Sequence, residues 1–341
     1  MPLPEDSLRV AIAGAASLRG QDLKVWLEES GFPAGEVRLF DEEPLAGTLT
    51  GVAGEAAVIQ SIDQGSFNGL RFVFFAGSRA FAKKHGLVAA RAGATVIDLT
   101  GELAGIPGSR QWIPRLDALV VRRQAAGAAA SPSRIYIAPS APAIMACAYS
   151  CAMAKFRPAR LLMIFFQPVS ERGRAGVEEL EGQMVKLLSL QPIPQDVFDC
   201  QVAFNMLDRW GVASPERLGD VRAAIGREVQ GYLGESGPIP AMTLVQVPVF
   251  YGHTFSAYAE FLQPPDLAAL TEGLQAAGFR SAGGDDPGPS NTGAAGESQA
   301  IITAAERDPG VPQGYWFWGA ADNLRLATAN ATQIAEKLLV S

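Results

Sequence analysis

The sequence predicts an α/β domain with a doubly wound parallel sheet, followed by an α+β domain. Over roughly the first 130 residues, short apolar runs alternate with stretches of helical periodicity, which is typical of a parallel sheet with helices on both faces. From about residue 160 onward the strands are longer and several helices follow them, which favours an antiparallel or mixed sheet. A chain of 341 residues that is 48% hydrophobic can bury the cores of two such domains.

In the first part we expect strands at residues 9–13, 36–40, 72–76, 95–99 and 135–138, and helices at 21–29 and 81–92. The run at 72–76 is continuously apolar, as in a strand buried on both faces.

In the second part we expect strands at 161–167 and 243–250, and helices at 177–190, 217–233, 266–277 and 323–340. Residues 282–298 are rich in Gly, Pro and Asp, which predicts a loop. The expected domains are residues 1–133 plus 322–341, and residues 134–321.

Charge and composition exclude several kinds of partner. A formal charge of −7 disfavours nucleic acid, and no apolar run is long enough to cross a membrane. The N-terminus lacks the features of a signal peptide, so we expect a cytoplasmic protein. The three cysteines have no metal-type spacing with the two histidines, so no metal site is expected. Cys147, Cys151 and Cys200 are expected to pack in the core, and His85 to lie at the surface.

A glycine-containing loop follows the first strand and precedes a helix. It runs from Gly14 through Ala15 and Ser17 to Gly20, the context in which a helix N-terminus holds a pyrophosphate. Asp41 ends the second strand, where a carboxylate accepts hydrogen bonds from the ribose of NAD and repels the 2′-phosphate of NADP. Ser17 stands where a glycine would let the backbone approach the phosphate. Two interpretations therefore stay open, a dinucleotide loop and a turn that kept only its shape.

Several motifs resemble the aspartate-semialdehyde dehydrogenase family, nearly from end to end of the chain. They are "GATVIDLTGEL" (93–103), "FFQPVSERGRAGVEELEGQ" (165–183), "QVAFNML" (201–207), "VPVFYGHTFSAYAEF" (247–261) and "DNLRLATANATQIAEKLL" (322–339). The resemblance implies a Rossmann-like domain plus an α+β dimerisation domain of the semialdehyde dehydrogenase type. It also implies a small-molecule ligand, NAD or NADP as the cofactor, and a homodimer formed through the second domain.

The resemblance also assigns roles to individual residues. Gln167 matches the family's active-site Gln, and His253 matches its general acid/base. Asn323 matches an Asn that contacts the cofactor. Gly14, Ala15 and Gly20 match the family's first loop, which also binds the cofactor. Arg227 matches the arginine that clamps the substrate's carboxylate, although the acidic residue usual before it is missing.

The family's nucleophile position is altered in this sequence. A cysteine in the motif A-N-P-N-C attacks the aldehyde, hydride passes to NADP, and phosphate displaces the acyl group. Laid on Ala138–Ala143, that cysteine falls on Pro142. Cys147 lies five residues further on and points away on the following helix. Ser140 is closer, but no second histidine is near it in sequence.

Pro142 therefore predicts a family member without the dehydrogenase activity, in which His253 lies at a solvent-accessible cleft position and has no catalytic duty. The alternative is an NAD-dependent oxidoreductase with an altered nucleophile or an altered substrate, using His253 with Ser140 or Cys147. A third, an N-acetyl-glutamyl-phosphate reductase, also needs the cysteine of the turn. The segment that begins at Asp41 favours NAD, unless no dinucleotide binds.

Overall fold

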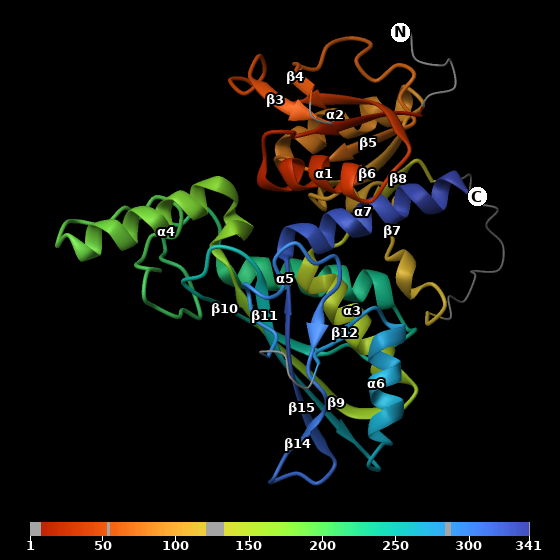
Figure 1. Cartoon of the computed structure of the whole chain (residues 1–341), viewed down its shortest axis with the longest axis vertical. Helices are drawn as coiled ribbons and strands as arrows, with labels where there is room; N and C mark the ends of the chain where they lie inside the picture. The colour runs from red at the N-terminus through yellow and green to blue at the C-terminus, as the bar shows by residue number, and fades with distance from the viewer. Residues whose placement is uncertain (1–7, 53–54, 121–132, 284–287, 341) are drawn as a thin grey trace. The chain divides into compact units, whose positions relative to one another are not determined.

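The computed structural model describes residues 8–52, 55–120, 133–283 and 288–340 (Figure 1). The chain divides into two compact units. Unit 1 comprises Met1–Pro114, Arg123–Ser140 and Ala327–Ser341, and unit 2 comprises Arg115–Arg122 and Ala141–Leu326. The last helix, α7 (Asn323–Leu339), contains the boundary between Leu326 and Ala327.

Unit 1 is built on a parallel six-stranded sheet. Its strands, in the order in which they pair, are β2 (Ala34–Phe40), β1 (Leu8–Ala13), β5 (Phe72–Phe75), β6 (Thr95–Asp98), β8 (Ile135–Ile137) and β7 (Arg110–Gln111). Every pairing is parallel, which confirms the sheet expected from the sequence. A separate antiparallel pair of strands, β3 (Leu49–Val52) with β4 (Glu55–Val58), was not expected.

Helices cover both faces of the first sheet. Alternate residues of each strand enter two different cores, as the two-residue period of a strand requires. One core contains Ile12 together with Leu23 of α1 (Leu18–Glu29) and Ile334 of α7. The other contains Ala13 together with Phe81 of α2 (Arg79–Arg91). The sheet is therefore doubly wound. Two short 3-10 helices complete the described structure between β6 and β8, η1 (Glu102–Gly105) and η2 (Pro114–Leu116).

Unit 2 contains a mixed sheet. Its main order is β10 (Ala241–Gln246), β9 (Pro158–Gln167), β11 (His253–Phe261), β15 (Gly314–Ala321), β13 (Ile301–Ile302) and β12 (Arg280–Ser281), and β14 (Glu306–Arg307) also pairs with β15. The β9–β11 and β11–β15 pairs are antiparallel, whereas β10 runs parallel to β9.

The helices of unit 2 lie on one face of this sheet. They include α3 (Ala141–Ala154), α5 (Leu218–Leu233) and α6 (Leu267–Ala276), which contact one another or the strands. A short 3-10 helix, η3 (Val169–Arg172), follows β9 and leads into α4 (Gly173–Leu188), which projects from the sheet (Figure 1). On the other face of the sheet the side chains of Ile164, Phe166 and Val245 are only half-buried.

Several expected element limits were wrong. The strand expected at 243–250 ends at Gln246, because Pro248 has no N–H to donate to a ladder. Helix α1 begins at Leu18, three residues before the expected start, because the Ser17 hydroxyl accepts a hydrogen bond from the Gly20 N–H and caps the helix. Strand β15 was not predicted, although its aromatic run has high β-propensity. In the loop expected at 282–298, the described residues form no helix or strand, and 284–287 lie outside the described residues.

Candidate functional site

The ends of three neighbouring strands of unit 2 bring predicted site residues together. Strand β9 ends at Gln167, β11 begins at His253, and β15 ends just before Asp322 and Asn323. The antiparallel register pairs His253 with Ala321 and Thr254 with Phe166, so these ends lie side by side. Five residues form what we call the sheet-end cluster: Gln167, Ser170, Glu171, His253 and Asn323.

His253 is fully buried in this cluster. Its side chain has 0% exposure, and its Nε2 lies 3.2 Å from the Glu171 Oε1. The ring of Phe165 packs edge-on against the imidazole, with 6.2 Å between centroids. The solvent-accessible position expected for His253 was therefore wrong. The reason is strand alternation, since His253 points to the same helix-covered face as the buried Phe255 and Ala257.

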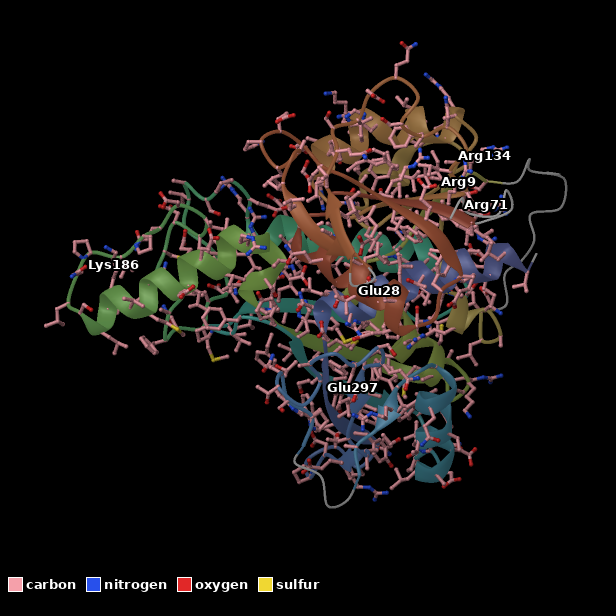
Figure 2. The ribbon with its side chains drawn as sticks, turned by 45° about the horizontal axis from the view of Figure 1, so that its top comes forward. Arg9, Glu28, Arg71, Arg134, Lys186 and Glu297 are labelled. Atoms are coloured by element: carbon pink, nitrogen blue, oxygen red, sulfur yellow. The ribbon has the colours of Figure 1, made fainter. Side chains whose placement is uncertain are left out.

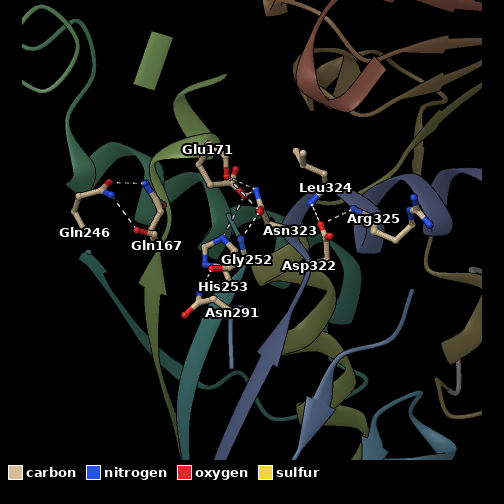
Figure 3. A network of polar contacts seen from close by, with 11 residues as sticks. Gln167, Glu171, Gln246, Gly252, His253, Asn291, Asp322, Asn323, Leu324 and Arg325 are labelled. Atoms are coloured by element: carbon tan, nitrogen blue, oxygen red, sulfur yellow. Dashed lines mark hydrogen bonds and ion pairs between the residues drawn. The ribbon is translucent and has the colours of Figure 1, made fainter. Parts of the chain in front are cut away.

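Asn323, the first residue of α7, connects the parts of the cluster (Figure 3). Its Nδ2 donates to the Glu171 Oε1 at 3.0 Å and to the Ser170 Oγ at 3.2 Å. Its Oδ1 accepts from the Gly252 N–H at 2.9 Å. The Asn323 amide thus ties η3 to the residue just before His253. Sequence motifs placed Asn323 and His253 in separate segments and gave no role to Glu171.

Gln167 has a different set of partners within unit 2. It is 1% exposed, and its Nε2 donates to the Gln246 Oε1 at 3.4 Å. The Gln246 Nε2 donates back to the Gln167 carbonyl at 2.9 Å, and the Trp210 indole N–H donates to the Gln246 Oε1 at 3.3 Å. Gln246 therefore fixes the amide of Gln167, a partnership that the sequence motifs did not indicate (Figure 3).

Pro142 is the second residue of α3, and the two cysteines further along this helix are buried to different degrees. Cys147 has 0% exposure, and burial raises the pKa of its thiol well above the usual value. Burial raises the pKa of the half-buried Cys151 to about 11. Cys200, like Cys151, is half-buried rather than in the core, so the expectation of core packing was wrong for both, and burial raises the pKa of Cys200 as well. A thiol with a pKa near 11 is a thiolate in only about one molecule in 10⁴ at pH 7.

These environments predict an order of alkylation by iodoacetamide. At pH 7 Cys200 should react first, and Cys151 should react at least about tenfold more slowly than Cys200. Cys147 should react only after unfolding, because the rate depends on both the thiolate fraction and the access of the reagent to the thiol. Between pH 7 and pH 10 the rate at Cys151 should rise about tenfold per pH unit. Mass spectrometry of tryptic peptides would follow each site. Labelling of Cys147 in the native protein ahead of Cys200 would contradict this account.

In unit 1, the loop after β1 is held tightly by its own surroundings. Gly14 has a φ of +92°, and a Cβ on it would lie closer than 3.0 Å to backbone atoms of Gly77. A Cβ on Gly20 would overlap the Gly14 carbonyl, so Gly20 lets α1 approach the loop. The Gly14 and Ala15 N–H groups donate to the Phe40 carbonyl at 2.8 and 3.1 Å. Ser17, besides capping α1, donates through its hydroxyl to the Ala76 carbonyl at 2.8 Å.

Asp41 contacts this same loop. Its side chain is 6% exposed, its Oδ2 accepts from the Ala16 N–H at 2.8 Å, and its Oδ1 accepts from the Glu42 N–H at 2.9 Å. The structure thus brings Gly14, Ala15, Ser17 and Asp41 together at the carboxyl ends of β1 and β2, where open α/β sheets bind ligands.

Other predicted residues lie apart from these two places. Arg227 is exposed on α5 and makes none of the described contacts within the sheet-end cluster. His85 is half-buried on α2, with its ring edge-on to Phe81 at 4.8 Å. Among the described residues, no group of three His, Cys, Asp or Glu side chains is arranged to hold a metal ion. Within the same parts of the chain, no helix is long and apolar enough to cross a membrane.

Comparison with known proteins defines the class of protein. Residues 9–107 match the semialdehyde dehydrogenase NAD binding domain, and residues 152–326 match the semialdehyde dehydrogenase dimerisation domain. The chain belongs to the semialdehyde dehydrogenase family. Its fold, a parallel-sheet Rossmann-like domain plus a mixed-sheet domain of the dimerisation type, is the one expected from the sequence.

Particular relatives resemble the chain along its whole length. The USG-1 protein homolog of Pseudomonas aeruginosa is 30% identical over 97% of this chain and 98% of its own. Aspartate-semialdehyde dehydrogenase 2 of Vibrio cholerae is 27% identical over 97% of both chains. Among solved structures, a probable aspartate-semialdehyde dehydrogenase from Pseudomonas aeruginosa superposes with a TM-score of 0.86 at 29% identity, covering 98% of this chain and 99% of that one.

Proposed function

We propose that this protein is a nicotinamide-dinucleotide-binding member of the family that does not oxidise aspartate semialdehyde by the thiol-dependent phosphorylating route. The observation that supports this most directly is that α3 offers no reactive thiol. Pro142 occupies the position that the family resemblance assigns to the nucleophile, and it offers no thiol. The two thiols further along the helix, Cys147 and Cys151, are shielded and have raised pKa values, which makes them poor nucleophiles at neutral pH.

The residues of unit 1 fit a dinucleotide. Within the described residues, the N–H groups of Leu18 and Arg19, in the first turn of α1, have no hydrogen-bond acceptor. Unpaired N–H groups at a helix N-terminus attract a pyrophosphate. Asp41 lies beside this turn and is held by the loop backbone, so its carboxylate is fixed near the place that a ribose would occupy. Gly14, Ala15, Ser17 and Gly20 would shape the loop, and Asn323 stays a cofactor contact by family position only.

We expect this site to bind NAD at least about tenfold more tightly than NADP, because Asp41 and its acidic neighbours repel a 2′-phosphate. Isothermal titration with both nucleotides would measure the ratio. Asp41→Ser should lower the preference for NAD over NADP. Glu43→Gln, which removes one exposed and screened charge, should change this preference much less. Tighter binding of NADP would contradict the role of Asp41, and no binding of either nucleotide would contradict the dinucleotide site.

A second candidate function is an NAD-dependent oxidoreductase with an altered nucleophile or an altered substrate. The contact between His253 and Glu171 favours it, because a histidine held by a carboxylate is a competent general base even without a thiol. Ser140, Arg227 and Gln167 would then serve an unidentified substrate. A screen of aldehydes with NAD, followed by His253→Ala, tests it. Absence of any nucleotide reduction in the wild-type protein would count against it.

We propose a homodimer that forms through the open face of the unit 2 sheet. Side chains on this face lie opposite one another in register, for example Ile164 beside Ser256 and Thr243, and Phe166 beside Val245. Phe166 packs against the 38%-exposed Trp318 with the two rings tilted and 5.6 Å between their centroids. A half-exposed apolar sheet face of this kind marks an interaction surface, and the family's dimerisation domain supports a second copy as the partner.

The remaining predictions concern setting and partners. The formal charge of −7 supports a small-molecule ligand rather than nucleic acid, and a cytoplasmic location stays a prediction. Fractionation of cells producing the full chain tests the location, and recovery in a membrane fraction would contradict it. Retention on DNA-cellulose at physiological salt would contradict the exclusion of nucleic acid.

A further inference from the structure

One ring nitrogen of His253 is left without a partner. The imidazole is fully buried, and its Nδ1 has no hydrogen-bond partner among the described residues. Buried polar atoms are nearly always paired, so an unpaired one calls for a ligand or an ordered water. The other ring nitrogen, Nε2, faces Glu171, so the two sides of the ring have different environments.

The contacts of Glu171 indicate which nitrogen carries the proton. Its Oε1 accepts from the Asn323 Nδ2 at 3.0 Å and lies 3.2 Å from the His253 Nε2 (Figure 3). A carboxylate oxygen only accepts hydrogen bonds, so the Nε2 must be the protonated atom of the neutral ring. The lone pair then lies on Nδ1, which is an acceptor that points away from Glu171.

We propose that Glu171 is a positioning residue that holds His253 in the Nε2–H tautomer, so that Nδ1 accepts a hydrogen bond from the hydroxyl group of a small bound molecule. The ligand class is a compact alcohol or aldehyde hydrate. The acceptor Nδ1 needs a hydrogen-bond donor, and a molecule whose only polar group is a carbonyl has none. The ring is fully buried and Phe165 packs edge-on against it, so the proposed ligand has to be compact.

Such a complex would also support proton transfer. A proton moving from the hydroxyl to Nδ1 breaks the O–H bond, leaves an alkoxide and makes the ring an imidazolium. The imidazolium keeps its Nε2–H on the Glu171 carboxylate, which offsets the new charge. This step needs neither Pro142 to be a cysteine nor a dinucleotide, so the inference stands or falls separately from the proposed function.

Histidine nitrogen NMR tests the proposal directly, because the chain contains only two histidines. Protein labelled with ¹⁵N in histidine gives two side-chain patterns, and His85→Gln assigns them. In the wild-type protein His253 should show the Nε2–H tautomer alone. Glu171→Gln should convert it to a mixture of tautomers, because an amide presents a donor as well as an acceptor, whereas Glu171→Asp should largely keep the single tautomer. Glu178→Gln, an exposed change on α4, should have no effect.

Two matched probes test the ligand. Isopropanol and acetone have nearly the same shape, but only isopropanol donates a hydrogen bond. Titration with isopropanol should shift the Nδ1 resonance and acetone should leave it in place, and Glu171→Gln should weaken the isopropanol response severalfold. An Nδ1–H tautomer in the wild-type protein, an unchanged tautomer in Glu171→Gln, or no difference between the two probes would each overturn the proposal. If Glu171→Gln fails to fold by circular dichroism, the wild-type and Glu171→Asp spectra still decide.

Discussion

Replacing Gly14 with alanine should destabilise unit 1 by about 4 kcal/mol, the sum of a strained backbone and a steric overlap. Gly14 has a φ of +92°, which an L-residue rarely adopts, and an added Cβ would overlap backbone atoms of Gly77 that cannot rotate away. The displaced loop should also lose its alignment with the N-terminus of α1, so NAD binding should fall. Urea unfolding would measure the change in stability.

Gly47 provides a matched control for this experiment. Its φ is +90°, almost that of Gly14, but nothing lies within 4 Å of the Cβ that would be added. Gly47→Ala should therefore cost only the backbone strain, about 1–3 kcal/mol, and should not affect nucleotide binding. An equal loss of stability in both variants would show that close packing of Gly14 against Gly77 contributes nothing.

Replacing Phe166 with aspartate should convert the protein from a dimer to a monomer. The side chain lies on the open sheet face near the end of β9 and packs against Trp318, so the variant would bury a charge without a partner in the interface. A loss of about 3 kcal/mol or more would raise the dimer dissociation constant by over about a hundredfold. Sedimentation at micromolar concentration should then give the chain mass of 36.0 kDa.

The control for this change is Leu188→Asp. Leu188 is 78% exposed at the end of α4, which projects from the sheet (Figure 1), so this variant introduces the same charge outside the proposed interface and should remain dimeric. If Leu188→Asp dissociates the protein and Phe166→Asp does not, the interface involves α4 and not the sheet face. A wild-type protein that sediments as a monomer would contradict the homodimer itself.

Much of unit 1 could be predicted from the sequence, because its strands and helices are marked by patterns within short stretches of residues. The continuous run Phe72–Phe75 indicates a strand buried on both faces, and it occupies the third position of the parallel sheet. The early start of α1 was missed because Ser17 was interpreted only as a missing glycine, although serine is a preferred N-cap. Among the charged side chains labelled in Figure 2, Arg9 forms an ion pair with Glu36 and the Arg134 Nη1 donates to the Gly93 carbonyl, and no sequence motif indicated either contact.

The sheet-end cluster was harder to predict, because its residues come from distant segments. Motifs indicated His253, Gln167 and Asn323, yet Glu171 gains its meaning only when η3 meets the start of β11 and the Asn323 amide joins them. The burial of His253 was also missed. A single residue at the start of a strand does not reveal which face of the sheet the helices cover, and a shift of one residue reverses the answer.

The central claim is that the chain has kept the family fold and lost the thiol-dependent reaction. The most direct test is phosphate-dependent oxidation of aspartate semialdehyde by the purified protein, with NAD and with NADP, followed as nucleotide reduction. We expect no reduction above the rate without enzyme, and no change on prior treatment with iodoacetamide. Reduction that depends on phosphate and is abolished by His253→Ala would contradict the claim.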